Sequence, residues 1–171
     1  MICGFFGGTF DPIHKGHLAL AKKCLEEVDY VLFCPAQVSP FKLKKPPLSS
    51  GGDRLNMIKI AIQGEPRFLV TDCELKRPPP SYTIDTILFL KKQTTDTFRL
   101  ILSEDEVEGL SGWKDSETLL KLAPPLIGVR TPLNSSLLRQ KLLRGEDCSS
   151  EVDKEVLDYI LEHQLYSAHY E

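Results

Sequence analysis

Two glycines and two histidines near the N-terminus have the residue types and the spacing of a phosphate site. They belong to segment 7–17, which reads GGTFDPIHKGH. Gly7 and Gly8 would leave the backbone bare where a phosphate approaches the end of a strand. A helix that begins just beyond them would offer unpaired N–H groups and the positive end of its dipole. His14 and His17 are three residues apart, so in a formed helical turn both could reach one anionic group.

The elements around this segment predict where it lies in a fold. Residues 2–6 read as a short apolar strand and residues 17–27 as a helix with one apolar stripe. Further apolar runs alternate with helical patterns along the chain, which is typical of a parallel sheet covered by helices. We therefore predict an α/β fold, a doubly wound Rossmann-like parallel sheet of about five strands with a helical C-terminus. The other predicted strands are 30–34, 68–70, 97–102 and 126–129, and the other predicted helices are 53–63, 83–92, 116–122, 134–144 and 151–163.

A strand, a glycine-rich turn and a helix also occur in many α/β proteins that bind no ligand there. The two histidines favour the phosphate site, because open α/β sheets bind ligands at the carboxyl ends of their strands.

Length and composition predict one ordinary globular unit. With 171 residues the chain can form one good core, so we predict a single domain over 1–171. A formal net charge of −3 does not predict a nucleic-acid surface, and no apolar stretch approaches the length of a membrane span. The five scattered cysteines form no C-x-x-C pair. They favour free thiols and a cytoplasmic location over a disulfide framework or a zinc site.

Segment 7–17 closely resembles the signature of the HxGH nucleotidyltransferases, in the form seen in bacterial nicotinate-mononucleotide adenylyltransferases. The resemblance implies that an adenylyl group passes from ATP to nicotinate mononucleotide, giving deamido-NAD and pyrophosphate in NAD biosynthesis. It implies direct attack by the mononucleotide phosphate, and Mg²⁺ that arrives with ATP and has few direct protein ligands. His17 is then the better candidate for stabilising the transition state. The ATP-binding residues implied in this segment are Gly7, Gly8, Thr9, Phe10, His14 and His17.

A lysine-rich loop follows the second predicted strand. Lys42, Lys44 and Lys45 lie in segment 35–53, and such clusters are usually solvated surface. The loop leaves the sheet beside the glycine turn, however, and the resembling family often has PPHK here. Lys42 then stands where a lysine holds the substrate phosphate, with Phe41 in place of the histidine. The resemblance implies a catalytic role for Lys42 beside the two histidines.

Two further segments bear on the acceptor. Segment 81–86, SYTIDT, reads as a capped helix start and also resembles the SYTxxT segment at the pyridine end of the family's pocket. The resemblance implies that Tyr82, Thr83 and Thr86 bind the acceptor. Trp113 is the only tryptophan, a residue that most often anchors a core. Its flanking glycines suggest instead a ring free to stack, and the resemblance implies stacking near the nicotinate.

The ATP end departs from the family's motifs at three positions, where Ser103 replaces a glycine, Asn134 the first serine and Ser136 the threonine. Asp105 is retained in the Gly-x-Asp element and could accept hydrogen bonds from a ribose, but Ser103 replaces the glycine. Segment 133–139, LNSSLLR, reads as a helix start and resembles the ISSTxIR motif. The resemblance implies that Ser135, Ser136 and Arg139 bind ATP phosphates and that Arg139 is also catalytic. The chain lacks the helix and strand, roughly two dozen residues, that the family usually inserts before this motif.

Three alternatives remain beside this interpretation. The same chemistry could act on nicotinamide mononucleotide or phosphopantetheine. A non-catalytic nucleotide-binding paralogue is suggested by Ser103, Phe41, Asn134 and the missing segment. A purely structural domain would leave segment 7–17 unexplained. The expected partners are ATP and nicotinate mononucleotide, with no nucleic-acid polymer, no membrane and no protein-bound metal.

Overall fold

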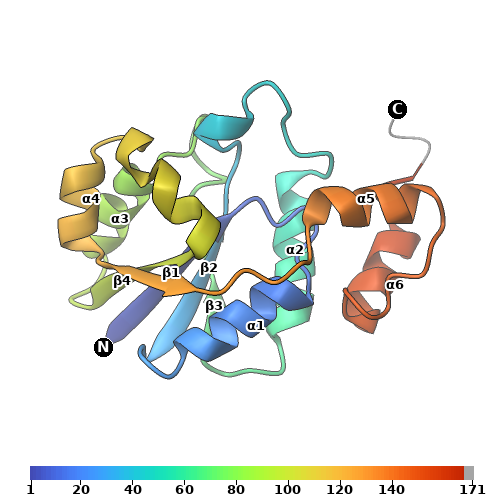
Figure 1. Ribbon diagram of the computed structural model, residues 1–171, viewed down its shortest axis with the longest axis horizontal. Coiled ribbons are helices and arrows are strands. Elements are labelled where there is room, and N and C mark those ends of the chain that lie inside the picture. Colours follow the sequence, from blue (N-terminus) through green and yellow to red (C-terminus); the bar gives the residue numbers. More distant parts are fainter. Residues whose placement is uncertain (168–171) are drawn as a thin grey trace.

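A computed structural model of the protein describes residues 1–167, and it contains one parallel sheet of five strands (Figure 1). All four neighbouring pairs are parallel, which confirms the predicted doubly wound α/β fold. The observed strands agree with the predicted ones within two residues. In spatial order they are β3 (Phe68–Val70), β2 (Tyr30–Pro35), β1 (Ile2–Gly8), β4 (Thr97–Ser103) and β5 (Pro125–Gly128).

Side-chain caps set the bounds of several helices. The first helix begins at Lys15 rather than near residue 17, because His14 caps it. The second begins at Gly51, because the Ser50 side chain accepts a hydrogen bond from the Asp53 N–H. The helices are α1 (Lys15–Cys24), α2 (Gly51–Ile62), α3 (Thr83–Lys91), α4 (Ser116–Leu122), α5 (Ser135–Leu143) and α6 (Lys154–Glu162), with 3₁₀ segments η1 (Pro40–Lys42) and η2 (Glu104–Gly112).

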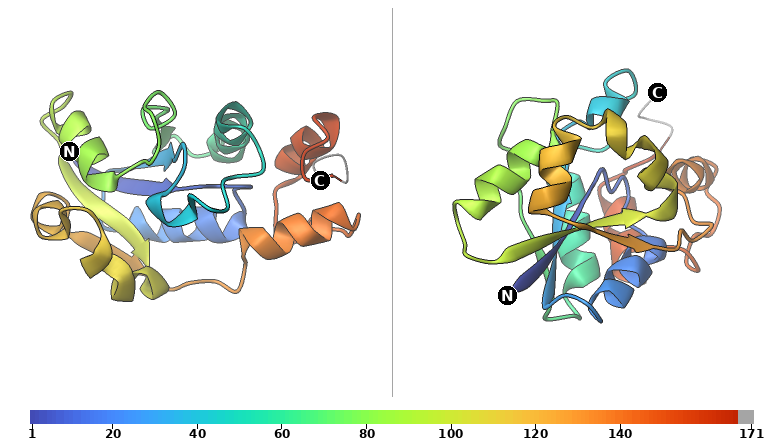
Figure 2. Two further views of the ribbon diagram at one scale, coloured as in Figure 1. Left: turned by 90° about the horizontal axis from the view of Figure 1, so that it is seen from above. Right: turned by 60° about the vertical axis from the view of Figure 1, so that its left-hand side comes forward.

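Successive side chains of β1 point to opposite faces, so the sheet buries a core on each side. Phe6 packs in one core with residues of α1, α2, α5 and α6. Phe5 packs in the other with residues of α3 and α4, which lie together on the left of Figure 1. The helical C-terminus stands at the end of the molecule nearest α1 and α2 (Figure 2). None of the helices in residues 1–167 has the length and apolar character needed to cross a bilayer.

The two central strands separate at their carboxyl ends. Pairing between β1 and β4 stops at Phe5 and Leu100, whereas β1 continues along β2 and β4 continues along β5. Helices α1 and α4 then leave toward opposite faces of the sheet. This is the topological switch point of the fold, the place where open α/β sheets bind ligands.

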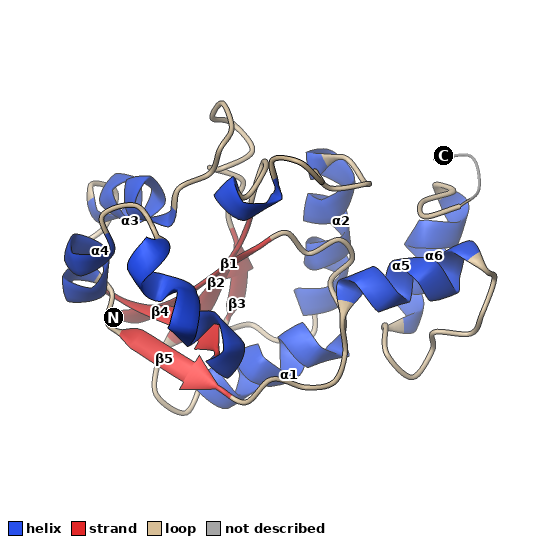
Figure 3. Cartoon of the chain, turned by 45° about the horizontal axis from the view of Figure 1, so that its top comes forward, coloured by secondary structure: helices blue, strands red, loops and turns tan. Residues whose placement is uncertain are grey.

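Strand β5 lies at the outer edge of the sheet (Figure 3). Within residues 1–167 no strand pairs with its far side, in agreement with the missing helix and strand. An extended segment, residues 129–134, leads instead directly from β5 to α5 (Figure 2).

Candidate active site

Two cavities open at the switch point and meet along one wall. The larger has a volume of about 500 Å³ and is lined by the glycine loop (residues 7–14), by α1 and by the start of α5. The smaller has a volume of about 300 Å³ and lies between η1, the start of α3 and the end of η2. We call the residues common to both the shared wall: Gly7, Gly8, Lys42 and Glu106. Two molecules bound in the two cavities would therefore touch at the end of β1.

The two histidines cap α1 reciprocally. His14 Nδ1 accepts from the N–H groups of Gly16 (3.0 Å) and His17 (3.4 Å), and His17 Nδ1 accepts from the His14 N–H (3.1 Å). The rings stack with centroids 3.7 Å apart. Gly16 fits this arrangement because a Cβ there would lie only 2.8 Å from the His14 ring. An accepting Nδ1 carries no proton, so each neutral ring carries its hydrogen on Nε2.

This capping corrects the expectation that α1 offers unpaired N–H groups. The Lys15 N–H donates to Glu151 O at 2.8 Å, and those of Gly16 and His17 are taken by His14. The larger cavity is therefore provided with imidazole Nε2–H donors from His14 and His17 in place of bare helix N–H groups. An anion bound here would be held by side chains.

Both imidazoles are neutral at neutral pH. Burial lowers the pKa of His14 to about 4, and the charge of Arg130 adds to the effect. Burial also lowers the pKa of His17 well below its usual value, helped by His14 and Lys42. Because the pKa of His14 is lower in the folded than in the unfolded chain, acid favours unfolding. This loss of folding stability begins near pH 6.5, the ordinary value, and is complete below about pH 4.

We therefore expect NMR titration of the ligand-free protein to show neutral, Nε2-protonated rings for His14 and His17 at pH 6. The midpoint for His14 should fall near 4. The control is the same protein unfolded in urea, where both rings should titrate near the ordinary value of about 6.5. A midpoint near 6.5 in the folded protein would contradict the reciprocal caps.

A buried arginine donates a hydrogen bond to the backbone of the glycine loop. Arg54 is 2% exposed, and its Nη1 donates to Thr9 O (2.9 Å) and Ala36 O (2.6 Å). Phe10 adopts a left-handed backbone conformation with φ of 52°. Its ring is 2% exposed and lies edge-on against His17, with centroids 4.9 Å apart. The loop conformation is thus fixed by contacts that hold it from several sides.

Basic side chains line the larger cavity around this loop. Lys42 Nζ donates to Thr9 Oγ1 at 3.0 Å, and burial followed by the Arg139 charge lowers the Lys42 pKa. Arg139 Nη1 donates to Asp11 O (2.8 Å) and Nη2 to Ser136 Oγ (3.0 Å). Arg130, in the extended segment that leads from β5 to α5, also lines this cavity. Asp105, which pairs with Arg130, and Glu106 also line this cavity, so Lys42 and Arg139 are the cations best placed for a polyphosphate.

The start of α5 is capped in the same self-contained way as α1. Asn134 Oδ1 accepts from the N–H groups of Ser136 (2.8 Å) and Leu137 (3.3 Å). Ser135 Oγ donates to Pro12 O at 2.9 Å, so this hydroxyl ties α5 to the glycine loop. Both predicted serines line the larger cavity.

Asp105 also lines the larger cavity, but both of its oxygens have protein partners. Ser103 Oγ donates to Oδ1 at 2.6 Å, and Arg130 Nη1 lies 2.8 Å from Oδ2. The Ser103 N–H donates to Glu106 Oε1, which closes a cap on η2, and the Ser103 hydroxyl also lies 3.0 Å from that oxygen. A ribose hydroxyl that reaches Asp105 would therefore use one of the remaining lone pairs of the carboxylate or displace one of these donors.

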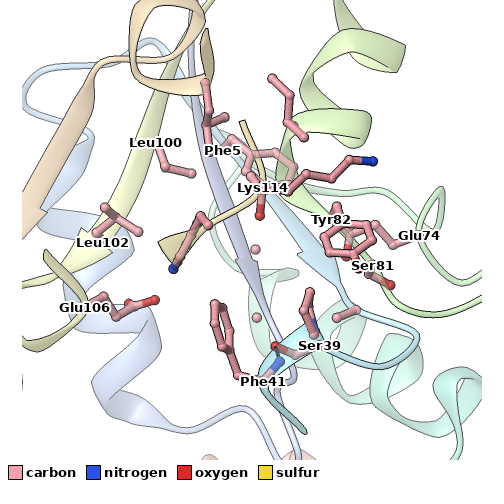
Figure 4. Close-up of a pocket in the computed structure, with 18 of the residues that line it drawn as sticks. Phe5, Ser39, Phe41, Glu74, Ser81, Tyr82, Leu100, Leu102, Glu106 and Lys114 are labelled. Carbon is pink, nitrogen blue, oxygen red and sulfur yellow. Dashed lines mark hydrogen bonds between the residues drawn. The ribbon is translucent and has the colours of Figure 1, made fainter. Parts of the chain in front are cut away.

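The smaller cavity is the more aromatic of the two (Figure 4). Tyr82, Thr83 and the partly buried Trp113, which were predicted to bind the acceptor, all line it. The Phe41 ring lies 6.2 Å from that of Trp113, and Lys114 Nζ lies 4.7 Å from the Tyr82 ring centroid. A flat ring could stack here between aromatic side chains.

Thr86 is the predicted site residue that lines neither cavity. It is fully buried, and its hydroxyl donates to Glu74 Oε1 (2.7 Å) and accepts from Arg77 Nη2 (2.6 Å). Burial raises the pKa of Glu74 to about 7. Because its hydrogen bonds are already made within the protein, Thr86 supports the wall of the smaller cavity through Glu74, which does line it.

Every other predicted site residue lines at least one of the two cavities. Thr9, which was predicted among the ATP-binding residues, lines only the smaller cavity, whereas Gly7, Gly8 and Lys42 line both cavities. Sequence reasoning missed Arg54, Arg130 and Glu106. Arg130 could have been found from its place at the carboxyl end of a predicted strand, whereas Arg54 has no local pattern that marks it.

Comparisons with known proteins agree on one family. Residues 5–155 match the model of the cytidylyltransferase-like family. A probable nicotinate-nucleotide adenylyltransferase of Dehalococcoides mccartyi is 36% identical, over 95% of this chain and 96% of its own. A probable nicotinate-nucleotide adenylyltransferase of Bacillus licheniformis is 35% identical, over 95% of this chain and 97% of its own.

Solved structures share the fold. The nicotinic acid mononucleotide adenylyltransferase of Plasmodium falciparum, complexed with NaAD, has a TM-score of 0.76 and 20% identity over 96% of this chain and 97% of its own. A putative nicotinate-nucleotide adenylyltransferase of Vibrio parahaemolyticus has a TM-score of 0.78 and 18% identity over 94% of this chain and 98% of its own.

Proposed function

Because the chain belongs to the cytidylyltransferase-like family, among relatives named nicotinate-nucleotide adenylyltransferases, we propose that its two cavities bind ATP and nicotinate mononucleotide. The protein is a nucleotidyltransferase of NAD biosynthesis. It transfers the adenylyl group of ATP to nicotinate mononucleotide and releases pyrophosphate. The observation that carries the assignment is the shared wall, which brings an aromatic cavity and a basic cavity into contact at the glycines.

The reaction needs alignment more than a reactive side chain. An oxygen of the mononucleotide phosphate forms a bond to the α-phosphorus of ATP, and the bond from that phosphorus to the leaving pyrophosphate breaks. The acceptor phosphate is itself the nucleophile, so no covalent enzyme intermediate is needed. The protein must hold two anions in line and stabilise the charge that develops on the oxygens.

Each basic residue has a place in this alignment. Lys42, on the shared wall, would contact the phosphates of both substrates. His14 and His17 would donate their Nε2–H groups to ATP oxygens, and neutral donors of this kind require no prior protonation. Arg139, with Ser135 and Ser136, would hold the phosphates that leave as pyrophosphate.

The arrangement of the His, Cys, Asp and Glu side chains bears on how a metal ion would take part. Within residues 1–167, no group of three His, Cys, Asp or Glu side chains converges on a point where an ion could bind. We infer that Mg²⁺ enters as part of the ATP substrate, bound mainly by phosphate oxygens and water.

Pyrophosphate release tests the proposal. Purified protein is supplied with Mg-ATP and, in separate reactions, nicotinate mononucleotide, nicotinamide mononucleotide or phosphopantetheine. Release with nicotinate mononucleotide at the highest kcat/KM supports the proposal. A higher kcat/KM with either of the other acceptors would move the assignment to that acceptor.

One observation favours a second candidate function, nucleotide binding without turnover. Ser103 and Arg130 both bind Asp105, so they crowd the carboxylate that would accept a hydrogen bond from an ATP ribose. Measurable ATP binding with no pyrophosphate release from any acceptor would support this candidate.

Trp113→Ala is expected to raise KM for nicotinate mononucleotide about 10-fold, because aromatic stacking contributes about 1–3 kcal/mol per ring. KM for ATP should stay within about twofold, because Trp113 does not line the larger cavity. Steady-state kinetics with each substrate varied in turn measures both values. Trp113→Phe, which keeps a ring, should recover part of the loss. A rise confined to KM for ATP would contradict the placement of the acceptor.

A further inference from the structure

The segment after α6 returns to the glycine loop through one tyrosine. Tyr166 is 3% exposed, and its hydroxyl donates to Asp11 Oδ1 at 2.5 Å. The two residues are 155 positions apart in the chain. A residue remote from every sequence motif is therefore in direct contact with the loop that lines the larger cavity.

Asp11 joins the glycine loop to three other parts of the chain by hydrogen bonds. Its side chain is 3% exposed, and besides Tyr166 it accepts from Leu48 N (2.8 Å), Ser49 N (3.3 Å) and Ser49 Oγ (2.5 Å). Its backbone carbonyl accepts from Arg139 Nη1 at 2.8 Å. One residue thus connects the Tyr166 hydroxyl with an arginine of the larger cavity.

The backbone at both ends of this contact is strained. Phe10, which precedes Asp11, has φ of 52°, and Tyr166 has φ of 53°. Bulky aromatic residues rarely adopt this left-handed conformation, and they keep it only where surrounding contacts hold them. Such strain is often associated with functional sites. A contact that joins two strained segments beside a cavity is a candidate for positioning the groups that line it.

We propose that Tyr166 is a positioning residue for adenylyl transfer, which acts through Asp11 to hold the glycine loop and Arg139 in place for the ATP phosphates. The inference rests on the proposed function for its kinetic consequence. Tyr166 lines neither cavity, so it touches no substrate. Arg139 lines only the larger cavity, whereas Gly7 and Gly8 line both, so the effect of Tyr166 should be greater on the use of ATP than on the use of the acceptor.

The chain provides a matched control for a purely structural role. The Tyr159 hydroxyl, in α6, donates to Asp53 Oδ1 (2.7 Å) and accepts from Asn56 Nδ2 (3.1 Å), both in α2. Like Tyr166, Tyr159 ties the C-terminal region to an earlier segment through an aspartate. It makes no hydrogen bond to the glycine loop.

The experiment compares Tyr166→Phe with Tyr159→Phe. Each loses one hydroxyl and keeps its ring. We expect Tyr166→Phe to lower kcat/KM for ATP about 10-fold or more and to change KM for nicotinate mononucleotide less than twofold. Tyr159→Phe should leave both within twofold of wild type. Equal losses in the two variants, or no loss in Tyr166→Phe, would overturn the proposal.

A binding measurement and a second variant keep the test decisive. The Kd of α,β-methylene-ATP, measured by calorimetry, should rise in Tyr166→Phe and not in Tyr159→Phe, even if the wild type releases no pyrophosphate. This binding measurement does not depend on turnover, so it tests the role of Tyr166 even if the proposed function fails. Asp11→Asn keeps the side-chain shape and should give the same selective loss, and adding Tyr166→Phe to it should give little more. If Tyr166→Phe does not fold, unchanged binding in Asp11→Asn would overturn the proposal.

Discussion

Replacement of His17 by alanine is expected to lower turnover about 10²–10³-fold, the usual effect of removing one donor that stabilises charge in a transition state. The ring supplies its donor from a neutral, fixed tautomer, because Nδ1 is occupied by the His14 N–H. Loss of the cap bond should cost about 1 kcal/mol of folding stability, and loss of the ring's packing against His14 and Phe10 adds to that cost. Steady-state kinetics with Mg-ATP and nicotinate mononucleotide, together with thermal unfolding, measures both effects.

His163→Ala is the matched control for this prediction. His163 stacks on Tyr159 with centroids 3.9 Å apart and lines neither cavity, so its removal should leave turnover within about twofold. Turnover of His17→Ala within threefold of wild type would refute the role given to His17.

Lys42→Met is expected to lower kcat/KM for both substrates about 10²-fold or more. Lys42 is the one cation of the shared wall, so its ammonium group serves the phosphates on both sides of the reacting bond. This double effect distinguishes it from Trp113, whose loss should affect the acceptor alone. The values of kcat/KM, obtained with each substrate varied at saturating partner, test the prediction.

Lys44→Met makes the same change of charge two residues further along the chain. Lys44 is exposed and lines neither cavity, so this variant should keep near-normal kinetics. A similar loss in both variants would mean that the loop acts only through its overall charge. Lys42→Arg should recover a part of the activity, since it keeps the charge but not the compact ammonium group.

Local pattern was sufficient to predict the fold. The apolar runs of the strands and the helical stripes between them are each confined to a few residues, and so each element could be recognised by itself. The segments predicted to bind substrates also follow strands or begin helices. Their meeting at the switch point follows from the parallel order of the sheet.

Side-chain hydrogen bonds could not be predicted in the same way. The sequence pattern that makes His14 and His17 candidates for binding an anion is equally that of two side chains capping a helix, and only the coordinates show that Nδ1 caps while Nε2 remains available. Thr86 matched a motif, yet its hydroxyl is taken by Glu74 and Arg77. Tyr166 meets Asp11 across 155 positions, a separation over which no local pattern carries information.

The shared wall also bears on inhibition. A molecule with an aromatic head and a polyphosphate tail can occupy both cavities at once, and joining two weakly bound halves gains affinity through effective concentration. The dinucleotide product, with its central diphosphate, would span both cavities, whereas pyrophosphate would bind only in the larger cavity that Arg139 lines. Product that stays bound therefore competes with both substrates together, and bivalent analogues that bridge Lys42 are the natural starting point for ligands of this protein.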